Sequence, residues 1–249
     1  MTEFILLFVA GFVGGMMNTV AGGGTFVTFP ALVLYGIPEV SANATATLSA
    51  LPGYLAGALG FRREVQRFDR RLLVRLTLWT LLGSAIGSGL LLVSSNAAFR
   101  ILVPFLLLVA TLVFMFGEQV RDYAARHSRG VTAFGAGTLL PVAIYGGYFN
   151  GGLGIVLLAL FALWGMRDLH EMNGLKTWLS FALSVISAVI FTVGGKIVWV
   201  PALVMMAGNT AGGYLGAPVA RRLPRSVLRG LIAVIGFGMT TLFFRRLFL

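Results

Sequence analysis

Polar side chains and glycine clusters recur at matching places in the two halves of this chain. Each half has an asparagine placed before a cluster of glycines, where a helix is free to break. These residues are Asn18 with Gly22, Gly23 and Gly24, and Asn150 with Gly151 and Gly152. The N–H groups at the start of the helix that follows such a break attract negative charge. The pattern therefore predicts one part of a binding site in each half.

A second set of polar residues follows each glycine cluster. Asn43 and Thr47 are four residues apart and lie on one face of a helix. Asn173 and Thr177 have the same spacing, and Lys176 lies three residues after Asn173 on nearly the same face. Amide and hydroxyl donors, helix N-termini and one ammonium group together suit a small anion. We therefore predict that both sets of residues bind the substrate.

These residues also have a structural interpretation. A buried asparagine such as Asn43 often serves only to hydrogen-bond one helix to another. Lys176 lies close to a predicted helix end, from which its side chain could extend to the cytoplasmic surface. The repetition of the pattern beside both glycine clusters favours the binding site.

The titratable residues limit the chemistry of the chain. All eight acidic residues and both histidines lie at predicted helix ends or in loops. Proton-coupled carriers place such groups inside the membrane, and an intramembrane protease needs an aspartate pair or a serine and a histidine there. The chain has no cysteine, which excludes disulfides and thiolate metal sites. We predict no enzymatic activity, no catalytic or metal site and no cofactor.

The composition identifies the solvent around these residues. Of the 249 residues, 58% are hydrophobic and 11% are charged, and the mean hydropathy is +0.92. A soluble domain has about 25% charged residues, so the lipid bilayer must be the solvent here. The net charge of +11 is typical of basic cytoplasmic loops, and we predict no nucleic-acid partner.

Ten apolar segments are visible, five in each half. They cover residues 4–20, 24–36, 41–61, 71–93, 98–116, 133–149, 153–165, 172–194, 197–219 and 226–244. A spanning helix needs about 20 residues, but segments 24–36 and 153–165 have 13 each. Short segments at matching places mark a transporter binding site. We predict an all-α integral membrane protein with about 8–10 transmembrane segments and a short discontinuous or re-entrant helix in each half. Ordinary helices joined by tight glycine turns are the alternative.

The two halves are related in sequence. An odd number of spans in each half would place the second copy upside down, so we predict two inverted-topology repeats, residues 1–117 and 131–249, joined by a cytoplasmic linker at 118–130. The matching pairs, 129 to 132 residues apart, are Asn18 and Asn150, Gly36 and Gly165, Asn43 and Asn173, Thr47 and Thr177, Gly83 and Gly212, and Gly87 and Gly216.

Glycines four residues apart share a helix face. Without side chains they let two helix backbones approach closely, which is common in membranes. Three such pairs predict helix contacts: Gly53 and Gly57, Gly83 and Gly87, and Gly212 and Gly216.

Basic residues are distributed unevenly over the predicted loops. If the loop after segment 41–61 is cytoplasmic, 14 arginines lie inside and four basic residues lie outside. Cytoplasmic loops are the ones enriched in Lys and Arg, so we predict a multi-pass protein of the bacterial inner membrane with both termini outside. The inner set is Arg62, Arg63, Arg67, Arg70, Arg71, Arg75, Arg121, Arg126, Arg129, Arg167, Arg221, Arg222, Arg225 and Arg229, and the outer set is Arg100, Lys196, Arg245 and Arg246.

Several longer motifs cover nearly the whole chain. They are residues 18–24, 28–32, 42–45, 51–53, 57–60 and 62–64 in the first half, and 145–149, 173–176, 212–217 and 220–224 in the second. Together they resemble the sulfite exporter TauE/SafE family, although the second glycine cluster is less full here than is usual there. The resemblance implies a small membrane transporter with inverted repeats that moves sulfur-containing or organic anions such as sulfite, sulfonates and sulfoacetate.

These observations predict a secondary transporter for such an anion, with export as its direction. Outward movement of one negative charge is favoured by about 2.3 kcal/mol per 100 mV of inside-negative potential, so a monoanion needs no coupled proton. An anion channel and a membrane-embedded subunit or scaffold without transport are the alternatives. The expected partners are the small anionic substrate and the lipid bilayer. Both a monomer and a homodimer are compatible with the sequence.

Overall fold

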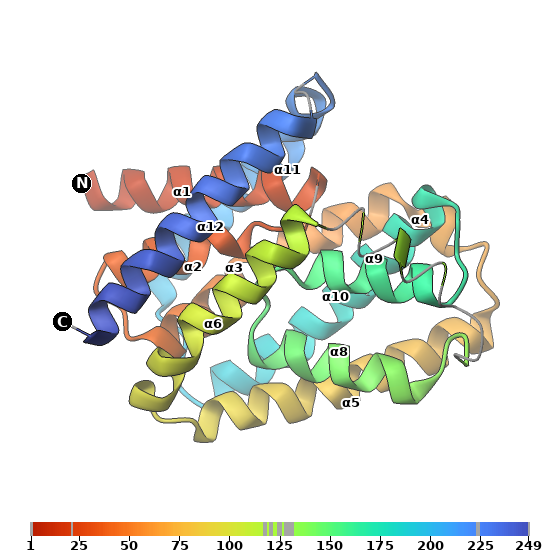
Figure 1. Cartoon of the computed structure of the whole chain (residues 1–249), viewed down its shortest axis with the longest axis horizontal. Coiled ribbons are helices and arrows are strands. Elements are labelled where there is room, and N and C mark those ends of the chain that lie inside the picture. The colour runs from red at the N-terminus through yellow and green to blue at the C-terminus, as the bar shows by residue number, and fades with distance from the viewer. Residues whose placement is uncertain are drawn as a thin grey trace.

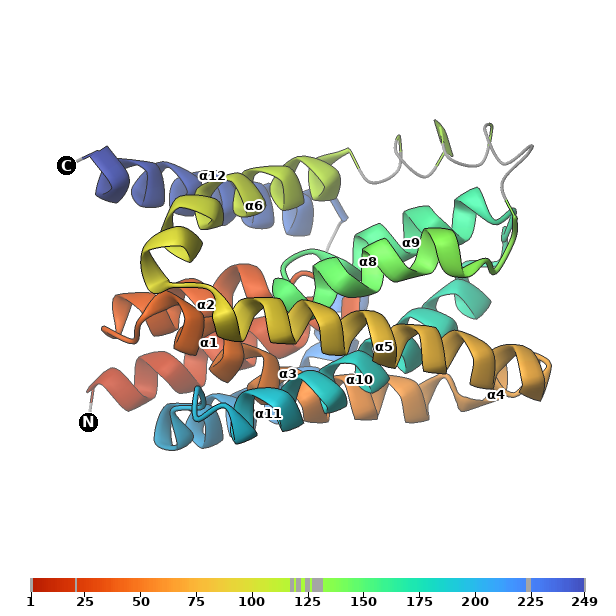
Figure 2. The same cartoon turned by 90° about the horizontal axis from the view of Figure 1, so that it is seen from below.

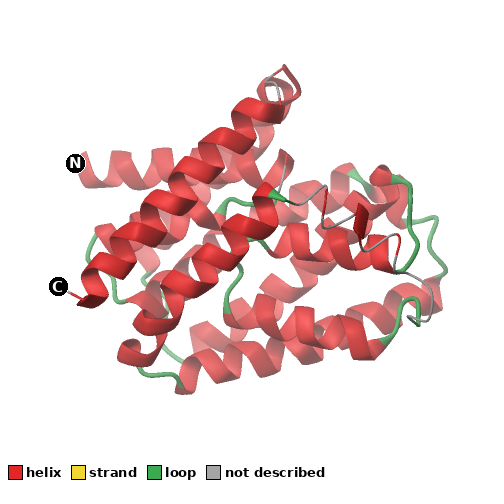
Figure 3. Cartoon of the chain, viewed as in Figure 1, coloured by secondary structure: helices red, strands yellow, loops and turns green. Residues whose placement is uncertain are grey.

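The computed structural model describes residues 2–20, 22–116, 119, 122, 123, 126, 132–222 and 225–248. Regular structure within these residues is entirely helical (Figure 3). The first half contains α1 (Thr2–Val20), α2 (Thr25–Leu34), α3 (Glu39–Gly60), α4 (Arg62–Val65), α5 (Arg70–Val93) and α6 (Asn96–Met115). The second half contains α8 (Ala136–Tyr148), α9 (Leu153–Leu163), α10 (Leu169–Val193), α11 (Trp199–Arg222) and α12 (Arg225–Phe248).

Each predicted apolar segment corresponds to one of these helices, with ends that differ by four residues at most. The one-turn helix α4 was not predicted, because it lies in an arginine-rich loop without an apolar run. Most of the predicted linker at 118–130 lies outside the described residues.

Several helices are apolar enough for a membrane. Among the described residues, α5, residues Asn96–Val113 of α6, and α10 have both the length and the hydropathy to cross a bilayer. Helices α3, α11 and α12 have 22, 24 and 24 residues, which is also enough length. Helices α2 and α9 have only 10 and 11 residues. The prediction of an all-helical protein with short second helices is therefore confirmed.

The helices run roughly along the long axis of the molecule, and both termini lie at the same end (Figures 1 and 2). Helix α1 enters from this end and α2 returns to it. Helices α8 and α9 form a similar pair that enters from the opposite end, near α4 (Figure 2). The connections within these two pairs are buried, including Gly22 to Gly24 and Asn150 to Gly152.

Close glycine contacts hold these pairs in place. Helix α1 packs along α11, and α5 packs along α8. A Cβ atom on Gly87 would lie 2.1 Å from the carbonyl oxygen of Ile144, and one on Gly212 would lie 1.9 Å from that of Phe12. Since no side chain fits at such distances, the helix backbones touch. The predicted helix contact is confirmed at these positions and at Gly83, which faces α8.

The remaining predicted glycine contacts have different outcomes. Gly57 faces the side chain of Thr177, so it does lie against a neighbouring helix, α10. A Cβ atom on Gly53 would meet nothing within 4 Å among the described residues, so the predicted contact at Gly53 is wrong. The side-chain position of Gly216 lies outside the described part.

Helix α10 carries Asn173 and Lys176, and its position is fixed at both ends. Asp168 caps its start: the carboxylate accepts hydrogen bonds from the backbone N–H groups of His170 (2.7 Å) and Glu171 (3.4 Å). These bonds lower the pKa of Asp168, because they stabilise the ionised carboxylate. Farther along, Ser187 Oγ lies 2.8 Å from Ser84 Oγ and from Ser88 Oγ of α5. Hydroxyl bonds of this kind join helices within membranes.

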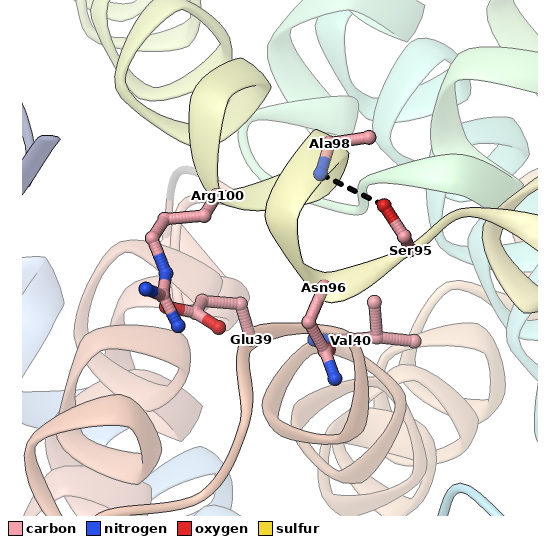
Figure 4. A network of polar contacts seen from close by, with 6 residues as sticks. All are labelled: Glu39, Val40, Ser95, Asn96, Ala98 and Arg100. Carbon is pink, nitrogen blue, oxygen red and sulfur yellow. Dashed lines mark hydrogen bonds and ion pairs between the residues drawn. The ribbon is translucent and has the colours of Figure 1, made fainter.

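An ion pair links α3 to α6 at the end that carries the termini (Figure 4). Arg100 Nε donates to Glu39 Oε1 at 2.8 Å. The Glu39 side chain is only 10% exposed, whereas that of Arg100 is 52% exposed. Beside this pair, the side-chain oxygen of Asn96 accepts from the backbone N–H of Val40 at 3.4 Å. These contacts fix the start of α3, the helix that carries Asn43.

We expect Arg100→Gln to lower the free energy of unfolding by about 1 kcal/mol, since it leaves the nearly buried Glu39 carboxylate unpaired. The partial exposure of Arg100 keeps the effect at this modest size. The double variant Glu39→Gln/Arg100→Gln should lose less than Arg100→Gln alone. Thermal unfolding in detergent measures both, and an equal or larger loss in the double variant would contradict the pairing.

Candidate functional site

The connections of the two short helix pairs meet in the interior. Gly22 and Gly152 have φ values of +77° and +71°, the left-handed region that favours glycine. A Cβ atom on Gly22 would lie 2.9 Å from the Cα atom of Gly154. The break after α1 therefore touches the start of α9, and the two predicted parts of the site form one place in the fold.

Asn18 shapes the first break. Its side-chain oxygen accepts a hydrogen bond from the backbone N–H of Gly24 at 2.8 Å, immediately before α2. The side chain thus satisfies one of the free N–H groups at the helix start. Gly24 itself admits no side chain, because a Cβ atom there would lie 2.2 Å from the carbonyl oxygen of Gly14. Asn18 and Gly24 hold the break in shape.

Asn150 occupies the corresponding place in the second half but differs in its contacts. It is 1% exposed, and neither atom of its amide group has a hydrogen-bond partner among the described residues. The Tyr54 hydroxyl faces this amide without forming a hydrogen bond of normal geometry. A buried amide left unsatisfied costs about 1–3 kcal/mol. A polar ligand at this place would remove that cost.

Asn43 joins the two halves. Its side-chain nitrogen donates to the carbonyl oxygen of Tyr148 at 3.0 Å, at the end of α8. Its side-chain oxygen is buried and has no partner among the described residues. Thr47 donates its hydroxyl to the carbonyl oxygen of Asn43 at 2.9 Å. Asn43 is therefore partly a helix–helix contact, as the structural interpretation expected, and keeps one free acceptor.

Lys176 is the charged group of this region. It is 3% exposed, so its side chain does not extend to the surface. Its ammonium group donates to the side-chain oxygen of Asn173 at 2.8 Å. Asn173 in turn donates to the carbonyl oxygen of Leu169, and Thr177 donates to that of Asn173 at 3.0 Å. These three predicted residues therefore lie together on α10.

The Lys176 ammonium group has no carboxylate partner in the part of the chain that the structure describes. The ion pairs among the described residues are Arg67 with Glu171 and Arg100 with Glu39, and neither includes it. The stem of Lys176 lies against the crossing of the two breaks, since a Cβ atom on Gly154 would be 3.4 Å from Lys176 Cδ. A buried cation without a counter-ion is costly, and an anionic ligand would supply the missing charge.

Tyr54 was missed in the sequence analysis. It lies 7 residues after Thr47 and 11 after Asn43 in the chain, so all three residues share one face of α3. That spacing could have identified it. Two surface grooves lie elsewhere, one along α5 and one between α3 and α11, and neither is lined by a predicted site residue. Lys176 itself is buried, whereas Asn173 is half-buried.

The comparisons with known proteins identify a family and several relatives. A family model described as "Sulfite exporter TauE/SafE" matches residues 7–243. The "Probable membrane transporter protein" of Haemophilus influenzae is 31% identical over 94% of this chain and 92% of its own length. The "Probable membrane transporter protein YfcA" of Escherichia coli strain K12 is 28% identical, over 95% of this chain and 87% of its own.

A third relative, "Probable membrane transporter protein ORF9" of a Sinorhizobium species, is 26% identical over 94% of this chain and 89% of its own. No solved structure matches the chain significantly. The match to the family model and those to the relatives extend over nearly the full length, and include both glycine breaks and the helices that surround Lys176. The chain therefore belongs to the sulfite exporter TauE/SafE family.

Proposed function

We propose that the protein is a secondary transporter that moves a small sulfur-containing or organic anion out of the cell. The observation that carries this proposal is Lys176. Its buried ammonium group has no carboxylate partner among the residues that the structure describes, and it lies beside two broken helix pairs. The names of the relatives, all membrane transporter proteins, support transport as the activity. Sulfite is the substrate that the family description names, and sulfonates and sulfoacetate are related sulfur-containing anions.

The binding step follows from the polar groups at the crossing. An anion entering there would pair with the Lys176 ammonium group and accept hydrogen bonds from the Asn150 amide. The starts of α2 and α9, which follow the two breaks, add partial positive charge. In a dry interior these interactions are stronger than in water, and they replace the water that the anion leaves behind.

The two halves are proposed to be inverted repeats that rock about this crossing. The helix contacts support this, because they occur in matching pairs: α1 with α11 corresponds to α5 with α8, and α3 with α11 corresponds to α10 with α5. Helix pairs α1–α2 and α8–α9 enter from opposite ends (Figure 2). In inverted repeats, rocking of one unit against the other exposes a central site alternately to each side.

The proposed orientation places both termini outside an inner membrane. The termini share one end of the molecule (Figures 1 and 2). Exposed Arg62 and Arg63 belong to α4 and Arg71 to the first turn of α5, and both segments lie at the other end (Figure 2). Arginines at the cytoplasmic end would concentrate anions near the inner entrance, and the membrane potential would drive a monoanion outward.

Flux of radiolabelled sulfite and sulfoacetate in proteoliposomes tests the proposal. We expect flux of at least one of them, and a potassium diffusion potential should change its rate in the direction expected for a moving negative charge. A carrier should also show flux that saturates at low substrate and counterflow of labelled anion, whereas a channel should show no counterflow. The proposal is wrong if protein that is folded and inserted moves neither anion at either potential. The protein would then have a different substrate or be a subunit without transport activity.

A further inference from the structure

The outward face of α5 near its N-terminus has a feature separate from the transport site. A groove of about 560 Å³ lies there, and the described residues that line it all belong to α5. They are Arg70, Arg71, Val74, Arg75, Leu78, Trp79 and Leu82. All are exposed except Trp79, which is half-buried.

The arginines of this groove are available to a ligand. None of Arg70, Arg71 and Arg75 forms an ion pair with a carboxylate in the described part of the chain. The nearest acidic residue in the sequence, Asp69, uses its carboxylate to cap α5 by accepting from the N–H of Leu72 at 2.9 Å. Guanidinium groups bind phosphate with paired hydrogen bonds. The head of the groove therefore suits a phosphate group.

The rest of the groove is apolar. From Arg71 to Leu82 the helix rises about 16 Å, roughly half the thickness of the hydrocarbon core of a bilayer. Exposed Val74, Leu78 and Leu82 follow the arginines along this distance, and the half-buried Trp79 lies among them on α5. A free phosphate ion would leave this apolar surface uncovered, whereas the acyl chain of a lipid would cover it.

We propose that this groove binds an anionic phospholipid, with its phosphate on Arg71 and Arg75 and an acyl chain along Val74, Leu78 and Leu82. Basic pockets at the cytoplasmic side of membrane helices are suited to such headgroups. The assignment of this site to the cytoplasmic leaflet depends on the proposed orientation. The existence of the site depends on neither the orientation nor transport. The lipid would fix α5, which packs against α8 and α10.

The test titrates the purified full-length protein in detergent with fluorescent phosphatidylglycerol. Each basic residue near an anionic headgroup contributes roughly fivefold in affinity, so Arg71→Gln/Arg75→Gln should bind about 25-fold more weakly. The matched control is Arg62→Gln/Arg63→Gln, which removes two exposed arginines of α4 outside the groove. This control should bind like the unaltered protein. Thermal unfolding checks that both variants are folded.

Two competitors separate a lipid from a phosphate site. Unlabelled phosphatidylglycerol should displace the probe, whereas inorganic phosphate and glycerophosphoglycerol, which lack acyl chains, should not. Equal losses of affinity in the two double variants, no loss in either, or displacement by inorganic phosphate would each overturn the proposal. So would equal affinity for zwitterionic phosphatidylcholine. Because no step measures flux, failure here leaves the transport proposal untouched.

Discussion

Lys176→Met should abolish most of the anion flux and at the same time raise the thermal stability of the protein without substrate. The side chain is buried and has Asn173 as its hydrogen-bond partner, with no carboxylate partner among the described residues. Losing one side of a buried charge interaction costs at least about 2 kcal/mol, so flux at low substrate should fall about 30-fold or more. Removing an uncompensated buried cation relieves a desolvation cost, so the unfolding temperature should rise.

The prediction is specific because flux should fall while the unfolding temperature rises. A lysine with only a structural role would lower stability and flux together when it is replaced. The control is Lys196→Met, the same substitution at the other lysine of the chain, which is partly exposed between α10 and α11. This variant should keep both its flux and its unfolding temperature. Wild-type flux in Lys176→Met would show that the anion binds elsewhere.

Gly87→Ala should destabilise the protein strongly, whereas Gly89→Ala should not. Both glycines lie within α5, two residues apart. A Cβ atom on Gly87 would lie 2.1 Å from the carbonyl oxygen of Ile144 and 2.8 Å from the backbone nitrogen of Tyr148. Because backbone atoms cannot rotate away, α5 and α8 would have to separate, at a cost of about 3 kcal/mol. At Gly89 a Cβ atom would meet nothing within 4 Å among the described residues.

Alanine at Gly89 should even stabilise the helix by up to about 1 kcal/mol, because it restricts the unfolded chain. Chemical unfolding in detergent, followed by circular dichroism, measures both variants. Equal stabilities would contradict the backbone contact between α5 and α8. Gly87→Ala should also reduce flux, since α8 ends immediately before the break that contains Asn150.

The helices themselves were predictable from the sequence. In a bilayer every backbone N–H and C=O group must be satisfied within the segment, so an apolar run becomes a helix almost regardless of its neighbours. For this reason segments such as 71–93 and 153–165 match α5 and α9 within two residues. The glycine breaks were also visible, because the left-handed backbone at Gly22 and Gly152 favours glycine.

The site residues were predictable as a set but not in their individual contacts. In the predicted repeat, Asn18 matches Asn150 and Asn43 matches Asn173, which suggests that the two residues of each pair have equal roles. In the structure Asn18 caps the start of α2, while the Asn150 amide is unpartnered among the described residues. The contact of Asn18 is local, but Asn43 donates to the carbonyl oxygen of Tyr148, which is 105 residues away. Local sequence patterns do not specify contacts over such distances.

The sequence by itself determined a helical membrane protein with two related halves, two broken helix pairs and one lysine among polar residues. Local rules suffice for these features, since hydropathy, helix periodicity and the conformational freedom of glycine act over short stretches. Only the tertiary structure decided that Gly22 lies against Gly154 and that Lys176 is buried beside them. These contacts depend on how closely α1 and α11, and α5 and α8, can approach. That distance is set by pairs of backbones far apart in the sequence, and it places the side chain of Lys176 beside Gly154.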